Sequence, residues 1–167
     1  MPASCPYVFL DVDGVLIPFA AGATGRAPSP VAATDLDVGG NPLLDRLDPE
    51  DGRQLLALDC QLVWATTWMA EANDVVAPLL GLPGLPVVPW PDSDDEPPRG
   101  VRWKAAFLTS WAAGRTFVWL DDEITDLDRQ WVTRNHPGKA LLHRVDPQLG
   151  LTDADFSTIR QWLRATT

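Results

Sequence analysis

The stretch Tyr7–Leu16, YVFLDVDGVL, constrains the fold of this chain more than any other. Its apolar and aromatic residues at Tyr7–Leu10 predict a short buried strand. Asp11 and Asp13 follow where that strand should end, and Gly14 permits a sharp turn with a positive φ. Both carboxylates should therefore lie at the carboxyl edge of a sheet, where ligands bind in open α/β folds.

Two carboxylates this close repel each other unless a cation lies between them. An oxygen-only pair suits a hard ion such as Mg²⁺ better than zinc. A calcium loop of the EF-hand type or an ordinary acidic turn is the alternative, but the next ligand position of such a loop is Val15 and its closing acid is missing. The pair therefore predicts a Mg²⁺ site.

The length and composition predict one domain over residues 1–167. A chain of 167 residues should bury roughly 70% of its unfolded surface, which is enough for one core. Cys5 and Cys60 lack metal or redox spacing, no apolar run is long enough to cross a membrane, and no secretion signal is present. We expect a cytoplasmic protein with free thiols. The net charge of −10 argues against broad attraction to nucleic acids or anionic membranes.

Apolar periodicity predicts strands that alternate with helices. The further strands are Cys60–Ala65, Thr116–Leu120 and Ala140–Val145, with a short one at Val87 and Val88. The helices are Asp48–Leu58, Met69–Leu80, Val101–Ala112, Ile124–Arg134 and a closing helix that a Thr152–Asp155 capping box opens. Helix positions expected in the core include Leu55, Leu56, Leu58, Leu127, Trp131, Phe156, Ile159 and Leu163. This alternation predicts a doubly wound parallel α/β sheet in three α/β/α layers.

Reactive side chains follow three of the predicted strands. In chain order they are Asp11 with Asp13, Thr66 with Thr67, and Asp121 with Asp122, and Lys104 lies on the helix before the third strand. Parallel strands end at one edge, so these groups should converge. Phosphoryl transfer needs a nucleophile, a metal, a hydroxyl, a cation and a proton donor, and each has a candidate here. Taken alone, Lys104 is more often a surface lysine whose stem covers the core.

This order and spacing resemble the haloacid dehalogenase (HAD) superfamily, whose motifs are a strand into DxD, a strand into Thr or Ser, a Lys, and a strand into DD or GDxxxD. The resemblance covers Tyr7–Asp126. It implies that Asp11 is a nucleophile that forms an aspartyl phosphate and that Asp13 is the acid/base. It also implies that Thr66 donates to the phosphoryl group and that Lys104 holds both this group and Asp11.

The resemblance further implies a Mg²⁺ ion bound by Asp11, by the backbone carbonyl of Asp13 and by an acid of the Asp121/Asp122 pair. Asp122 is favoured as the ligand, with Asp121 supporting it. Thr67 replaces Thr66 if the strand is one residue longer, and Asp126 gives a DxxxD variant of the last motif. The acid at position 13 indicates phosphate chemistry, because the dehalogenases of the family lack it.

The segment WATTW, Trp64–Trp68, also resembles small HAD domains found in or near RNA repair proteins and polynucleotide phosphatases. Large caps in this family follow the first motif or lie between the second and third. Thr66 to Lys104 leaves room for a helix, a strand and a loop, and Ile17–Asn41 allows a small lid or a disordered segment. We therefore expect no large cap and an open site.

These residues together predict a Mg²⁺-dependent phosphohydrolase that acts on a phosphate monoester through an aspartyl phosphate. A phosphotransferase or a polynucleotide-end phosphatase of the same fold is the alternative. A receiver-like signalling module or a non-catalytic binding module is the alternative of another class, but a receiver has its acid pair before its phosphorylated Asp, the reverse of the order here.

The acidic run Asp92–Glu96 favours small phosphate esters, including nucleotide-like ones, over long polyanions. Trp68 and Trp90 flank the predicted site and could stack on a base, although tryptophans so placed more often belong to the core.

Overall fold

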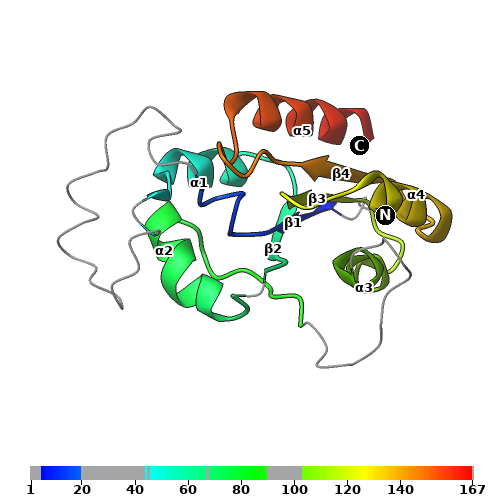
Figure 1. The fold of residues 1–167 in the computed structure, drawn as a ribbon, viewed down its shortest axis with the longest axis horizontal. Coiled ribbons are helices and arrows are strands. Elements are labelled where there is room, and N and C mark those ends of the chain that lie inside the picture. Colours follow the sequence, from blue (N-terminus) through cyan, green and yellow to red (C-terminus); the bar gives the residue numbers. More distant parts are fainter. Residues whose placement is uncertain (1–4, 20–43, 45, 67, 90–102, 167) are drawn as a thin grey trace.

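A four-stranded parallel sheet forms the centre of this computed structural model, which describes residues 5–19, 44, 46–66, 68–89 and 103–166 (Figure 1). The strands are β1 (Tyr7–Leu10), β2 (Gln61–Trp64), β3 (Phe117–Asp121) and β4 (Ala140–Arg144), in the order β2-β1-β3-β4. The helices are α1 (Pro49–Leu56), the π-helical segment η2 (Ala72–Val76), α2 (Ala77–Leu80), α3 (Trp103–Ala112), α4 (Asp126–Asn135) and α5 (Asp153–Thr166). Across these ranges no helix combines the length and apolar character needed to cross a membrane.

The register of the sheet brings three strand ends to one edge. The central strand β1 pairs Leu10 with Trp64 of β2 and with Leu120 of β3. The ladder continues past β1, where the Asp11 nitrogen donates to the Leu120 carbonyl at 3.2 Å and the Ala65 nitrogen donates to the Leu10 carbonyl at 2.7 Å. The prediction of a parallel, doubly wound α/β sheet is confirmed.

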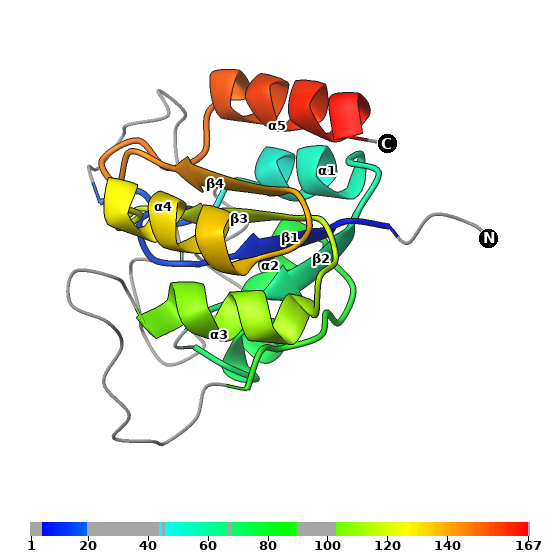
Figure 2. The ribbon, with the colours of Figure 1, turned by 90° about the vertical axis from the view of Figure 1, so that its right-hand side faces the viewer.

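Alternate strand residues face opposite sides of the sheet and form two cores. Val8 and Leu10 belong to a core that includes residues of α1, α2 and α5, whereas Phe9 and Trp119 belong to a core that includes residues of α3 and α4. Figure 2 shows α1 and α5 on one side of the sheet and α3 on the other. The three-layer prediction is therefore also confirmed.

Local capping signals correctly predicted where two helices begin. The Asp48 carboxylate accepts the Glu50 backbone N–H at 2.9 Å at the start of α1. Before α5, the Asp155 carboxylate accepts the Thr152 backbone N–H at 2.8 Å, and the Thr152 hydroxyl accepts the Asp155 backbone N–H at 3.3 Å. The predicted inward residues of α5 are buried: Phe156, Ile159 and Leu163.

Two helix positions expected in the core are instead 50% exposed, Leu56 and Leu127. In α1, the buried side is occupied by Leu55, and Leu56 is turned away from it. In α4, the Thr125 cap donates its N–H and its hydroxyl to Asp128, whose side chain is fully buried. Asp128 and Val132 then define the inner face, so Leu127 points outward.

The predicted helix Met69–Leu80 is interrupted. Its first part is η2, in which the Ala77 N–H bonds to the Ala72 carbonyl five residues earlier. Pro78, at the start of α2, has no N–H to continue an α-helical ladder, and Gly81 ends the helix at φ 72° as expected. The predicted strand at Val87 and Val88 is reduced to one parallel bridge between Val87 and Trp64. No cap domain occurs in the described residues between Thr66 and Lys104.

The chain after β1 is anchored on both sides of residues 20–43. The Arg46 Nη1 donates to the carbonyls of Pro18 at 3.1 Å and Phe19 at 2.8 Å, and the Phe19 nitrogen donates to the Pro147 carbonyl at 2.7 Å. The predicted lid lies largely outside the described ranges, as do Thr67, Trp90, the acidic run 92–96 and Val101. The single domain over 1–167 stays a prediction.

Candidate active site

Asp11 is the first residue after the central strand, and it is only 7% exposed. Its Oδ1 accepts the Val12 backbone N–H at 2.8 Å. Its Oδ2 lies 3.4 Å from the Lys104 Nζ. The carboxylate is therefore held at the sheet edge by one backbone donor and one cation.

A tight turn carries the chain away from Asp11. The nitrogens of Val15, Leu16 and Ile17 all approach the Val12 carbonyl, at 3.2, 2.9 and 3.0 Å. Gly14 adopts φ 76°, and a Cβ added there would lie 2.6 Å from the Asp122 Oδ2. Glycine is thus required at position 14 both for the backbone conformation and for the space beside Asp122.

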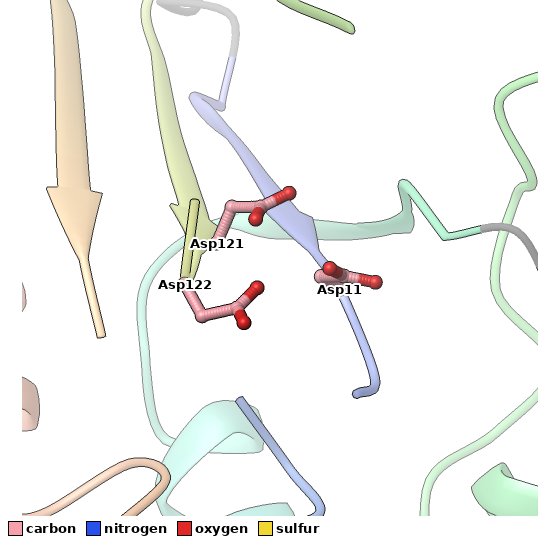
Figure 3. Close-up of side chains that lie close together, drawn as sticks. All are labelled: Asp11, Asp121 and Asp122. Carbon is pink, nitrogen blue, oxygen red and sulfur yellow. The ribbon is translucent and has the colours of Figure 1, made fainter. Parts of the chain in front are cut away.

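Asp121 and Asp122 come from the neighbouring strand. Asp121 is the last residue of β3, one residue later than the predicted strand end at Leu120, and it is almost fully buried. Its Oδ1 accepts the Glu123 N–H at 2.9 Å, and its Oδ2 accepts from the Lys104 Nζ at 3.1 Å. Figure 3 shows that Asp122 lies beside Asp121 and directs its carboxylate into the space shared with Asp11.

Lys104, on α3, bridges the two strand ends. It is 6% exposed and forms ion pairs with both Asp11 and Asp121. Burial alone lowers the pKa of Lys104, but the two carboxylates outweigh burial and raise it overall, so the lysine is charged. The alternative of a surface lysine is therefore wrong.

Three carboxylates, Asp11, Asp121 and Asp122, lie beside one lysine, Lys104, which forms ion pairs with Asp11 and Asp121. Burial and the negative charge of Asp121 raise the pKa of Asp11 to about 7, although Lys104 acts against them. Burial and a side-chain hydrogen bond with Asp121 raise the pKa of Asp122 to about 6. Both shifts have the same two leading causes, burial and the neighbouring Asp121, so the site carries more negative charge than Lys104 offsets.

A divalent cation fits this imbalance. Asp11, Asp121 and Asp122 each offer a carboxylate oxygen, and these oxygens lie within 4.8 Å of one another. The donor set contains only oxygen, which suits Mg²⁺. The Asp13 side chain is not part of this cluster, so a metal contact from Asp13 remains a prediction for its backbone carbonyl.

Thr66 and Asp13 are linked through Trp68. Thr66, fully buried just past β2, accepts the Trp68 backbone N–H on its Oγ1 at 3.3 Å. The Trp68 indole Nε1 donates to the Asp13 Oδ2 at 3.2 Å. Sequence reasoning missed this bond, because it considered Trp68 only for stacking or for the core. The WATTW segment was the signal available, but it does not reveal where the indole points.

Arg144 was also missed. It ends β4, pairs with Asp121 in the sheet register, and donates from Nε to the Asp122 backbone carbonyl at 3.2 Å. This bond connects β4 to the backbone of Asp122, directly beside the acidic cluster.

The raised pKa values predict that the metal-free protein loses stability as the pH rises. Between its unfolded pKa of 3.8 and its folded pKa of about 7, Asp11 binds more protons in the folded state. The free energy of unfolding therefore falls through that window. Without metal, the melting temperature should be higher near pH ~5 than near pH ~8, and saturating Mg²⁺ should reduce the difference. In Asp11→Asn the metal-free difference should shrink; an unchanged difference in that variant would contradict the assignment.

Comparison with known proteins gives two matches. A family model described as the HAD domain in Swiss Army Knife RNA repair proteins matches residues 7–156. No curated protein matches the chain. Among solved structures, the HAD domain of effector protein Lem4 from Legionella pneumophila is similar with a TM-score of 0.54, covering 98% of this chain and 96% of that one at 11% identity. At that identity the structural likeness establishes a shared fold alone.

Proposed function

The chain belongs to the family of HAD domains found in Swiss Army Knife RNA repair proteins, and from this premise we propose that it is a Mg²⁺-dependent phosphohydrolase of phosphate monoesters. Family membership supports phosphatase-type chemistry in general. The observation that carries the finer proposal is the contact of Lys104 with both Asp11 and Asp121, which joins a candidate nucleophile to a candidate metal ligand.

In the proposed first step, a carboxylate oxygen of Asp11 attacks phosphorus. The new oxygen–phosphorus bond forms as the bond to the leaving oxygen breaks, and Asp13 gives its proton to that oxygen. Lys104 orients Asp11 and offsets the negative charge of the phosphoryl group. The Thr66 hydroxyl donates to a phosphoryl oxygen. The products are an alcohol and an aspartyl phosphate.

In the second step, water attacks the phosphorus of the aspartyl phosphate. Asp13, now ionised, takes a proton from this water, and the bond between phosphorus and Asp11 breaks. Phosphate leaves and Asp11 is regenerated. Asp13 therefore acts as the acid in one step and as the base in the next.

The proposed metal ligands are Asp11, Asp122 and the backbone carbonyl of Asp13, with Asp121 in support. Asp121 already accepts from Lys104 and from the Glu123 N–H, which is why Asp122 is the preferred contact. When bound, Mg²⁺ supplies positive charge to the phosphate oxygens.

The test of the covalent step is direct detection of the intermediate. The protein is mixed with a phosphate monoester and Mg²⁺, quenched in acid, digested and analysed by mass spectrometry. A phosphoryl group on the peptide that contains Asp11 is expected. Turnover without any phosphorylated peptide, under conditions that trap a known aspartyl phosphate, would overturn the mechanism.

A second candidate is a polynucleotide-end phosphatase. The family match favours it, because HAD domains of this family occur in RNA repair proteins. A phosphotransferase is a further variant: it shares the first step, but the phosphoryl group then passes from Asp11 to an acceptor other than water. A small ester remains the first choice because the chain carries a net charge of −10. An acidic run also follows residue 91, comprising Asp92, Asp94, Asp95 and Glu96. Like charges ~10 Å apart in water repel by about 0.4 kcal/mol each before screening.

We predict that kcat/KM for a nucleoside monophosphate exceeds that for an oligonucleotide with the same terminal nucleotide by a few-fold at low salt. Physiological salt, with a Debye length of about 8 Å, should narrow the difference. Changing the four acids to Asn or Gln should narrow it at low salt and hardly alter it at high salt. Equal or better turnover of the oligonucleotide by the unmodified protein would make the polynucleotide end the preferred substrate.

A further inference from the structure

Trp68 connects two groups that have proposed chemical roles. Its indole N–H donates to the Asp13 Oδ2 at 3.2 Å, and its backbone N–H donates to the Thr66 Oγ1 at 3.3 Å. The first contact joins residues that are 55 positions apart in the chain. Trp68 thus links the turn after β2 to the carboxylate on the turn after β1.

The backbone beside Trp68 adopts a conformation that costs energy. Met69 has φ 53°, in the left-handed region that residues with a side chain rarely adopt. The Met69 N–H donates to the Thr66 carbonyl at 3.2 Å and closes the turn that contains Trp68. Such conformations persist where surrounding contacts determine them, and they gather at functional sites. Trp68 itself is partly buried and packed against the core. The direction of its indole is therefore fixed by this packing and by the backbone turn.

The backbone of Asp13 is fixed independently of its carboxylate. Asp13 forms a parallel bridge with Ile17, and the Gly14 N–H donates to the Ile17 carbonyl at 2.9 Å. These contacts hold the Cα of Asp13 in place. The carboxylate still needs a donor of its own to select one rotamer, and the indole of Trp68 provides that donor.

An indole N–H suits a carboxyl group that must gain and lose a proton. It donates one hydrogen bond and offers no acceptor, so it does not compete for the proton, as a histidine or lysine would. With Oδ2 of Asp13 engaged by Trp68, Oδ1 is the oxygen that carries the proton. The same contact holds when Asp13 is protonated and when it is ionised.

We propose that Trp68 is a positioning residue for Asp13, which it orients so that Oδ1 delivers a proton to the leaving oxygen of the substrate. This inference rests on the proposed phosphatase function and adds a determinant of leaving-group dependence to it. A positioning role has a specific consequence. Loss of the Trp68 contact should lower kcat/KM most for substrates whose leaving oxygen needs a proton.

The test is Trp68→Phe, which removes the N–H and keeps an aromatic ring. Two substrates are compared, an alkyl phosphate, whose leaving oxygen requires a proton, and p-nitrophenyl phosphate, whose leaving group departs without one. The measured quantity is kcat/KM, because it reports the steps up to transfer of the phosphoryl group to Asp11 and excludes the later attack by water. General acid catalysis contributes about 10²–10⁴-fold. We expect kcat/KM for the alkyl ester to fall about tenfold and that for the aryl ester to fall less than about twofold.

Trp64→Phe is the matched control. The Trp64 indole donates to the Asn73 Oδ1 at 2.8 Å, so this variant also loses one tryptophan hydrogen bond near the end of β2 but does not touch Asp13. It should change kcat/KM for both esters by the same factor. Melting temperatures of both variants separate loss of folded protein from loss of positioning. An equal fall for the two esters in Trp68→Phe, or no fall in either, would overturn the positioning role.

A second measurement examines the contact without turnover. In ¹H–¹⁵N spectra, Trp68→Phe identifies one indole N–H resonance among those of the eight tryptophans. In Asp13→Asn that resonance should shift more than the resonance of Trp64. An unmoved Trp68 resonance would overturn the inference and leave the phosphatase proposal intact. Failure of the unmodified protein to hydrolyse either ester would overturn the phosphatase proposal, and this inference with it.

Discussion

Replacing Asp11 with Asn should abolish turnover of phosphate monoesters in a protein that remains folded. The amide keeps the shape of the side chain but cannot attack phosphorus. Uncatalysed hydrolysis of these esters is so slow that enzymes accelerate it by up to ~10²¹. Loss of the nucleophile should therefore reduce kcat by at least about 10³-fold. The fold should tolerate the change, because burial and Asp121 already disfavour the charged form of Asp11.

The measurement is kcat on a phosphate monoester with saturating Mg²⁺, together with the melting temperature. Asp153→Asn is the matched control, since Asp153 opens α5 and contacts Gln54 away from the acidic cluster. The control should keep full activity. Retention of more than a small fraction of activity by pure Asp11→Asn protein would rule out the covalent mechanism.

Removing divalent metal should have the second largest effect. Without the metal ion, the carboxylates of Asp11, Asp121 and Asp122 lie close together, and Lys104 forms ion pairs with Asp11 and Asp121. Chelation should abolish hydrolysis, and adding Mg²⁺ should restore it. Mg²⁺ at about 100 times its Kd should stabilise the folded state by about 2.7 kcal/mol. For a chain of this size that corresponds to a rise of roughly 5–10 °C in melting temperature.

Asp122→Asn distinguishes a specific site from general screening of charge. This variant removes one proposed ligand, so a higher Mg²⁺ concentration should be needed for both activity and stabilisation. Asp153→Asn should respond to Mg²⁺ as the unmodified protein does. Phosphatase activity that survives chelation would show that the metal assignment is wrong. A melting temperature that Mg²⁺ does not raise would show that the site is not preformed.

Features encoded within a few residues were predictable from the sequence. The Asp48 N-cap, the Thr152–Asp155 capping box and the strand at Tyr7–Leu10 depend on neighbours in the chain, and each lies where the pattern indicated. The exposure of Leu127 was not predictable, because it follows from the burial of the neighbouring Asp128 side chain. That side chain is buried where it accepts the N–H of Thr125, the N-cap residue of the helix. The π-helical segment was not predictable either. It contains Asn73, whose amide bonds both the N–H and the carbonyl of Leu85, twelve residues later in the chain.

The same distinction applies to the site. The sequence predicted Asp11 and Asp121 at strand ends on one edge of the sheet, because parallel strands share an edge. The structure makes their strands neighbours and brings Lys104 to both carboxylates. Periodicity could only put Lys104 beside the buried stripe of its helix. The bond from Trp68 to Asp13 depends on the left-handed backbone of Met69 and on contact between distant turns. Neither leaves a periodic pattern in the sequence.

The bonds from Arg46 to the carbonyls of Pro18 and Phe19 have a consequence for how such domains diversify. They hold Arg46 beside Pro18 and Phe19, so the described residues on either side of positions 20–43 are joined directly. Each doubling of a loop's length costs only about 0.6 kcal/mol in closure entropy. Descendants of this domain could therefore lengthen, shorten or exchange the sequence between Phe19 and Arg46 while the acidic cluster is inherited unchanged.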